Sequence, residues 1–173
     1  MSIALSKAID LIAEGNFVLL DILTVTLKMS ITSSIVALLI GVPLGVLFGS
    51  TSFLGKRVII VLNRTMMGLP PVVCGLLCYL MFCGVGPLRY LHLLYTVAGM
   101  AIAQVILITP VIVGTIEPFV DSIYPEIREA AMGLGLSKFK TLCLIINEST
   151  YQIISTYLLG FSRALAEVGA VSM

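Results

Sequence analysis

The stretch Pro125-Glu-Ile-Arg-Glu-Ala-Ala-Met-Gly-Leu-Gly-Leu-Ser-Lys-Phe-Lys-Thr141 is the longest polar interval in a chain whose 173 residues are 59% hydrophobic. Only 11% of the residues are charged, compared with about 25% in soluble domains. The mean hydropathy is +1.14. A soluble protein of this length could not bury so much apolar surface, so the composition predicts a membrane protein. We therefore expect residues 125–141 to face water and a soluble partner.

Four apolar stretches flank this interval, and each is long enough to cross a membrane, which takes about 20 residues. They cover approximately residues 22–48, 58–82, 93–116 and 145–173. No repeat or linker divides the chain, which predicts a single all-α, polytopic membrane domain over residues 1–173. Residues 1–16 carry three charges among apolar residues at helical spacing. This pattern predicts an interfacial helix rather than a secretory signal.

Basic residues set the expected orientation. Six of them lie in or near the segments between the first two and the last two spans: Lys56, Arg57, Arg64, Arg128, Lys138 and Lys140. The opposite side carries only Lys7, Arg89 and, near the start of the first span, Lys28. Because basic residues favour the cytoplasmic side, we predict an external N-terminus and a cytoplasmic coupling segment over residues 117–141.

The first half of the polar interval has the features of a helix start. Pro125 suits a first helical position, where its missing N–H costs nothing. Glu126 and Glu129 would complement the positive end of the helix. Ala130 and Ala131 are small, so a groove on a partner could approach the backbone closely. The alternative is an ordinary loop helix.

The second half has the features of a sharp turn. Gly133 and Gly135 can end a helix, because glycine accepts the left-handed conformation. Ser137 can then cap the next helix. The whole interval thus predicts a short helix, a turn and a second helix that re-enters the bilayer.

Two further motifs place polar or helix-breaking residues inside spans. Arg163 and Glu167 are four residues apart, hence on one helix face. Each charge costs about 2.5–3.5 kcal/mol at mid-bilayer on insertion scales, so both should face a partner or a pathway. Two interpretations stay open: a structural ion pair, or an anion route in which Glu167 orients the Arg163 guanidinium. Likewise, Pro70 and Pro71 break the second span, either as a packing kink or beside a pathway.

Nothing in the chain predicts catalysis, a cofactor or a metal site. The Gly49–Lys56 segment is one residue too long for a phosphate loop, and Arg57 replaces the Ser or Thr. Cys74, Cys78 and Cys83 have no His or carboxylate neighbours, so we expect free thiols. The net charge of +1 gives no argument for nucleic acid. A lone secondary transporter or a membrane enzyme needs more intramembrane ionisable groups than this chain has.

The polar interval also carries a family resemblance. Glu129-Ala-Ala131, with Gly135 six residues after the glutamate and Ile145 ten residues after the glycine, resembles the EAA signature of ABC-importer permeases. In that family the pattern continues with Leu-Pro, where this chain has Asn147 and Glu148. The departure leaves open the angle at which the last helix enters the membrane.

Residues 63–73 and 163–170 resemble the tungstate-type branch of oxyanion permeases, to which molybdate and sulfate permeases are close relatives. The resemblance implies a type I importer bundle with five or more helices. The last residues, 168–173, have no polar flank, so we expect at least one more helix in a complete version.

The implied function is import of tungstate or molybdate across the prokaryotic cytoplasmic membrane, with sulfate or another anion as the alternative. The implied partners are membrane lipid, a second permease copy, two cytoplasmic ATP-binding subunits and an extracytoplasmic oxyanion-binding protein. Coupling is then assigned to Glu129, Ala130, Ala131 and Gly135, and the translocation pathway to Arg163, Glu167, Pro70 and Pro71.

Overall fold

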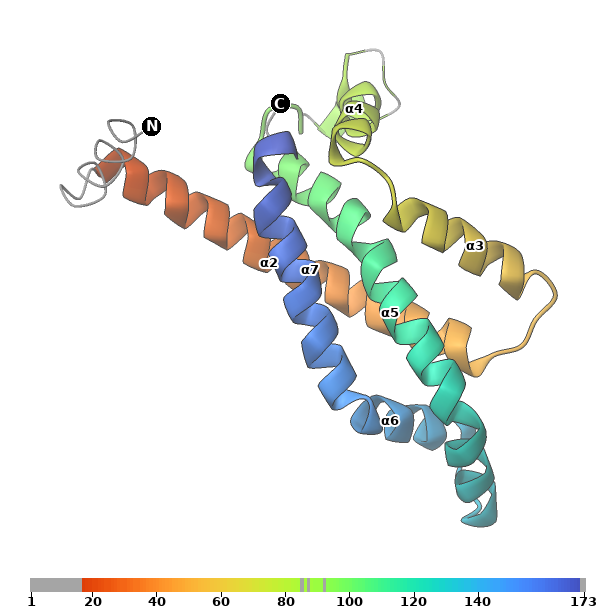
Figure 1. Ribbon diagram of the computed structural model, residues 1–173. Helices are drawn as coiled ribbons and strands as arrows, with labels where there is room; N and C mark the ends of the chain where they lie inside the picture. Colours follow the sequence, from red (N-terminus) through yellow and green to blue (C-terminus); the bar gives the residue numbers. More distant parts are fainter. Residues whose placement is uncertain (1–16, 85, 87, 92, 172–173) are drawn as a thin grey trace, which may run out of the picture.

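The computed structural model describes residues 17–84, 86, 88–91 and 93–171, without the side chains of 17–19, 91 and 167–171. Within these residues every regular element is helical, which confirms the predicted all-α bundle (Figure 1). The interfacial helix expected over residues 1–16 lies outside this description. The elements are α2 (Phe17–Ser50), α3 (Lys56–Met67), α4 (Pro71–Phe82), the 3-10 helix η1 (Arg89–Leu91), α5 (Val97–Gly133), α6 (Lys138–Glu148) and α7 (Thr150–Val171).

The contact between α2 and α5 forms the centre of the bundle. Gly41, Gly45 and Gly49 recur every four residues in α2 and therefore share one face. The facing residues of α5 are branched and have the same spacing: Ile112, Ile116 and Val120. A Cβ on any of these glycines would lie only 2.6–2.8 Å from the nearest α5 side-chain atom. The missing side chains thus let the two helices approach closely, as small residues do in membrane bundles.

α7 packs against both α2 and α5, and α6 leads into it across the lower end of the bundle (Figure 1). The Gln104 side-chain amide donates a hydrogen bond of 3.2 Å to the Ala164 carbonyl and so links α5 to α7. α6 and α7 are separated at Ser149, which is fully buried. Its N–H and hydroxyl both donate to the Ile145 carbonyl. This turn, formed without proline, sets the direction of α7 that the sequence left open.

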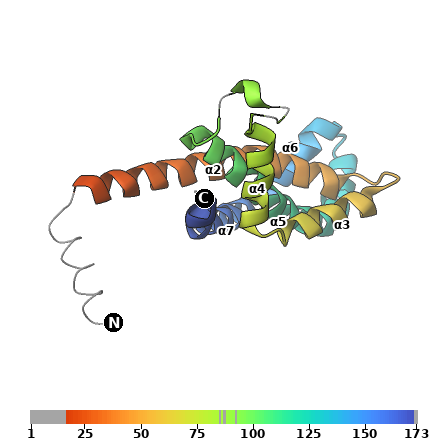
Figure 2. The ribbon, with the colours of Figure 1, turned by 90° about the horizontal axis from the view of Figure 1, so that it is seen from above.

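The helix break predicted at residues 68–71 is confirmed. α3 and α4 meet there at 103°, and α4 crosses the bundle in the view from above (Figure 2). Pro71 begins α4, where its missing N–H needs no partner. Cys74 and Cys78 are buried on the inner face of α4, together with Phe82.

The separate helix expected to begin at Pro125 is wrong, because α5 runs unbroken from Val97 to Gly133 with Pro110, Pro118 and Pro125 inside it. A proline in a helix interior costs about 3 kcal/mol in an isolated helix. Contacts with the other helices stabilise it here: Val120 is fully buried, and Ile123, Tyr124 and Ile127 pack against the core on both sides of Pro125. Tertiary packing therefore overrides the local break signal.

The number of predicted spans is also revised. Among the described residues, two helices are long and apolar enough to cross a membrane, Leu20–Ser50 and Val97–Gly133. The bent α3–α4 pair makes a third if it counts as one span. The sequence predicted four. The fourth stretch, which begins near Ile145, divides at Ser149 into α6 and α7. α7 has 22 residues and is long enough, but it contains Arg163, Glu167 and several other polar residues and is not among the two apolar helices.

Candidate functional site

The turn after α5 is a complete glycine-terminated helix cap. Gly135 has a φ of +65°, in the left-handed region that favours glycine. The Leu136 N–H donates to the Ala131 carbonyl, and the Gly135 N–H donates to the Met132 carbonyl. These two bonds define a Schellman motif, which satisfies the last carbonyls of the helix. The predicted end of the helix is confirmed. Ser137 occupies the cap position of α6, but its side chain makes no capping hydrogen bond.

The surface of this turn is partly apolar. Glu129 and Ala130 are exposed, as the docking interpretation requires. Ala131 is only 2% exposed, so it faces the interior of the chain rather than a partner. Three large apolar side chains around the turn are exposed instead: Met132, Leu134 and Phe139. The sequence analysis did not identify them. Large apolar residues within a polar interval could have indicated an exposed apolar surface.

α5 is long enough to place this turn well beyond its own apolar part. Its 37 residues span about 55 Å at 1.5 Å per residue, whereas the hydrocarbon core of a bilayer is about 30 Å thick. If the apolar part that starts at Val97 crosses the core, the part after Ile116 projects beyond it. Charged residues begin there, with Glu117 and Asp121.

Arg163 lies beside the helix break. Its Nη1 donates a hydrogen bond of 3.1 Å to the carbonyl of Met67, the last residue of α3. In a continuous helix this carbonyl would bond to the N–H of residue 71, but proline has none. Arg163 therefore donates the hydrogen bond that the Met67 carbonyl cannot receive from Pro71. Pro70 is exposed and Pro71 is half-buried at the same break.

Glu167 lies one helical turn beyond Arg163 on α7, as the spacing predicted. Its side chain is outside the described part of the structure, so the pairing with Arg163 stays a prediction. Arg163 and Glu167 belong to α7, and the two prolines lie at the start of α4. The hydrogen bond from Arg163 to the Met67 carbonyl connects α7 to the end of α3 beside these prolines.

The sequence analysis missed a set of polar contacts between α3 and α5. Lys56 Nζ lies 2.7 Å from Asp121 Oδ1. Arg64 Nη2 lies 3.9 Å from Glu117 Oε2. The Asn63 amide also donates to the Pro110 carbonyl at 3.0 Å. These partners are 47–65 residues apart in the chain, so no local spacing could reveal the pairs.

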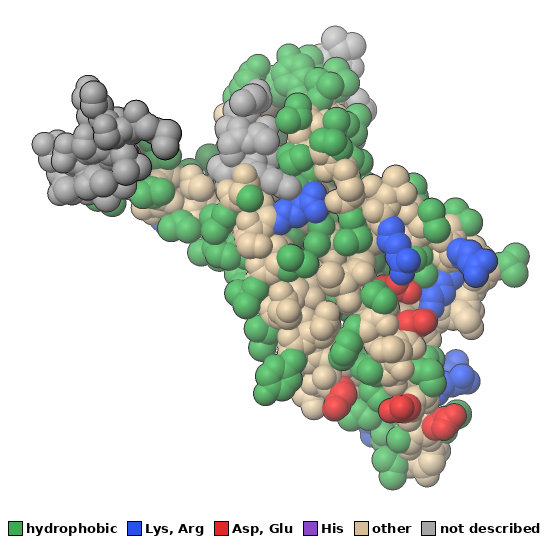
Figure 3. Space-filling model, viewed as in Figure 1, with side chains coloured by type: hydrophobic (Ala, Val, Ile, Leu, Met, Phe, Trp, Pro, Cys, Tyr) green, Lys and Arg blue, Asp and Glu red, His purple; other side chains and the backbone are tan. Residues whose placement is uncertain are grey.

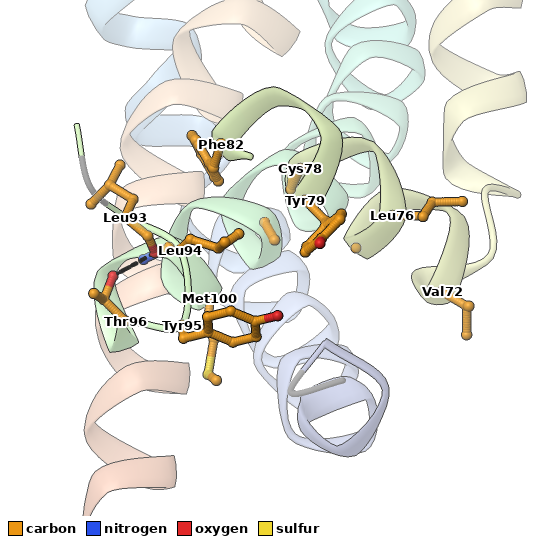
Figure 4. Close-up of a pocket in the computed structure, with 13 residues that line it drawn as sticks. Val72, Leu76, Cys78, Tyr79, Phe82, Leu93, Leu94, Tyr95, Thr96 and Met100 are labelled. Atoms are coloured by element: carbon orange, nitrogen blue, oxygen red, sulfur yellow. Dashed lines mark hydrogen bonds between the residues drawn. The ribbon is translucent and has the colours of Figure 1, made fainter. Parts of the chain in front are cut away.

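A cavity of about 370 Å³ opens between α4 and the segment that leads into α5 (Figure 4). Its walls are mostly apolar and include Phe82, Leu93 and Met100, with the phenol rings of Tyr79 and Tyr95. None of the side chains that line it is charged. An anion moved there from water would lose its hydration without a compensating cation. The cavity is therefore not a candidate anion site.

Comparison with known proteins agrees with these features. The family model for the binding-protein-dependent transport system inner membrane component matches residues 41–173, which include the helix break, the turn and Arg163. This chain belongs to that family. Its membership and its long apolar helices make it a multi-pass membrane protein.

Curated relatives carry names from anion transport. A probable anion ABC transporter permease of Haloferax volcanii is 33% identical over 88% of this chain and 66% of its own length. The tungstate uptake system permease of Peptoclostridium acidaminophilum is 30% identical over 95% of this chain and 72% of its own length. A probable molybdenum ABC transporter permease of Haloferax volcanii is 31% identical over 91% of this chain and 60% of its own length. The chain thus spans about two thirds of the length of these relatives.

Proposed function

We propose that this chain is the membrane-spanning subunit of an ATP-driven importer for an oxyanion. The observation that carries the proposal is the turn after α5, which exposes Glu129, Ala130 and a small apolar surface beyond the membrane-spanning part. Such a projection offers a soluble ATP-hydrolysing subunit both a charged group and apolar contacts. In this proposal Gly135 and the buried Ala131 shape the turn rather than contact the partner.

The proposed cargo is tungstate or molybdate, with sulfate as the alternative. Relatives named for each of these anions resemble the chain, the sulfate permease of Helicosporidium at 28% identity. The proposed assembly contains two permease chains, two cytoplasmic ATP-binding subunits and an extracytoplasmic binding protein. In this assembly the turn after α5 lies in the cytoplasm, and the ATP-binding subunits hydrolyse ATP.

Co-purification followed by uptake tests this function. We expect an ATP-binding subunit to co-purify with the chain and the assembled complex to take up labelled tungstate or molybdate into vesicles only when ATP is supplied. Replacing Glu129 by Lys should weaken the association, because it reverses the charge of an exposed docking residue. Uptake by the chain alone, driven by an ion gradient, would instead identify a secondary transporter.

Arg163 gives a second prediction, which separates its two interpretations. Glutamine keeps N–H donors for the Met67 carbonyl but has no charge. If the guanidinium also attracts the passing anion, Arg163→Gln should lower uptake about tenfold or more, since a hydrogen bond to a charged group contributes about 1.5–3 kcal/mol. The measurement is the rate of anion uptake against anion concentration, at matched amounts of assembled complex.

Lysine is the matched control at the same position. Arg163→Lys keeps the positive charge and one hydrogen bond to the Met67 carbonyl, but not the planar guanidinium. It should retain more uptake than Arg163→Gln if charge is what matters. Equal and undiminished uptake in both variants would leave only the structural role at the helix break.

A further inference from the structure

α3 lies at the surface of the bundle. It contains no buried residue. At its start Gly55 has a φ of +100°, and at its end the chain turns by 103° into α4. A helix with little buried surface between two turns has few packing contacts that resist displacement. Its position therefore depends on the polar contacts that attach it to its neighbours.

Two ion pairs attach α3 to α5. Lys56 and Asp121 form the closer pair, near the start of α3. Arg64 and Glu117 form the second pair, two helical turns further along α3, and only the carboxylate is buried, with 8% of its side chain exposed. Figure 3 shows charged side chains of both signs gathered over α3 and the adjoining part of α5, below a largely uncharged upper region. Removing Arg64 would leave a buried carboxylate without its cation, which is costly.

The same stretch of α5 leads directly to the turn that we propose as the docking site. Asp121 precedes Glu129 by eight residues within one continuous helix, a distance of about 12 Å along its axis. Pro125 between them removes one backbone hydrogen bond, but the helix stays continuous and Ile123, Tyr124 and Ile127 pack against the core around it. Displacement of the end of α5 can therefore reach Asp121. At the far end of α3, Arg163 holds the Met67 carbonyl beside the Pro70–Pro71 break.

We propose that the Lys56–Asp121 and Arg64–Glu117 pairs form a latch that makes α3 move together with α5. The four residues are positioning residues, which contact neither ATP nor the anion. When the turn after α5 is displaced, they make the helix break move with it. This inference rests on the proposed transport function and adds to it the connection between the turn and the break. Without the latch, α5 would move while α3 stays behind or moves independently.

The test combines a distance measurement with a coupling measurement in the assembled complex. Spin labels are placed at Val61→Cys on α3 and Ser122→Cys on α5, both exposed positions, after the four native cysteines are replaced. In the double variant Glu117→Gln/Asp121→Asn we expect a broader distribution of α3–α5 distances. We also expect about a tenfold fall in anion taken up per ATP hydrolysed, the usual size of a coupling effect, while hydrolysis continues.

Two controls separate the latch from general damage. Asp21→Asn removes a carboxylate from an exposed position on α2, outside the proposed coupling segment, and should change neither readout. The exchanged pair Lys56→Asp/Asp121→Lys restores opposite charges at the same contact and should recover most of the coupling lost in Asp121→Asn alone.

An unchanged distance distribution in the double variant, or a broader one with normal uptake per ATP, would overturn the latch. If the unmodified complex carries no oxyanion, the proposed function fails, and the distance measurement alone then decides whether the two pairs hold α3 to α5.

Discussion

Gly45→Leu is expected to prevent the α2–α5 contact from forming. A Cβ at this position would lie 2.8 Å from both Cβ and Cγ2 of Ile116. These atoms form the branch point of a fully buried side chain, so they cannot rotate away as the end of a flexible chain could. α5 would have to withdraw along a seam where its neighbour contributes mostly glycine and serine.

The expected cost is large because membrane helices associate mainly through close packing. Overpacking a well-packed core typically costs about 1–3 kcal/mol. Leucine at the middle one of the three glycine positions should reach the upper part of that range or exceed it. We expect little folded protein, measured as the yield of monodisperse chain in detergent and as its thermal unfolding temperature.

Gly75 supplies the matched control for this prediction. It also lies within a helix, but nothing comes within 4 Å of a Cβ built on it. Gly75→Ala should therefore be neutral or stabilising by up to about 1 kcal/mol, since alanine favours the helix. Gly45→Ala gains the same helical preference but meets Ile116, so it should be destabilised. Equal stability of the two alanine variants would show that the glycine contacts do not determine how closely the helices approach.

The features that sequence predicted well are those with a local cause. Pro70 and Pro71 cannot complete the helix hydrogen bonds, and α3 and α4 indeed separate there. Gly135 is free to adopt a positive φ, and the turn that ends α5 indeed contains this residue with such a φ. In both cases the signal lies within four residues of the structural consequence, so no knowledge of neighbouring helices was needed.

The features that sequence missed depend on contacts between distant segments. Pro125 was expected to begin a separate helix, but packing on α5 keeps the helix intact. Lys56 and Asp121 are 65 residues apart, and their pairing appears only after α3 folds back along α5. Arg163 donates a hydrogen bond to the Met67 carbonyl, which becomes available because of Pro71 in another helix, so no local spacing could predict this contact. The pairing of Arg163 with Glu167 stays a prediction.

Gly135→Val is expected to disconnect ATP hydrolysis from anion uptake while the membrane-spanning part still folds. The residue has a φ of +65°, which costs an L-residue about 1–2 kcal/mol, and a β-branched side chain is especially disfavoured there. No atom lies within 4 Å of a Cβ at this position, so the cost comes from the backbone alone. The turn should therefore relax to a different conformation and move Glu129 and Ala130 relative to α6. We expect at least a tenfold loss of uptake at nearly normal ATP hydrolysis, measured in parallel on one preparation.

Two neighbouring variants identify the backbone as the cause. Gly133→Ala also points into open space, but its φ is not positive, so uptake should stay normal. Gly135→Asn keeps a residue that tolerates the left-handed region and should retain much of the activity despite a larger side chain than alanine. If valine, asparagine and glycine at position 135 support equal uptake, the conformation of this turn is not needed for coupling, and contacts of the α5 end other than the turn must transmit the partner's movement. A graded loss, with valine far below asparagine, ties transport to the one positive φ that ends α5.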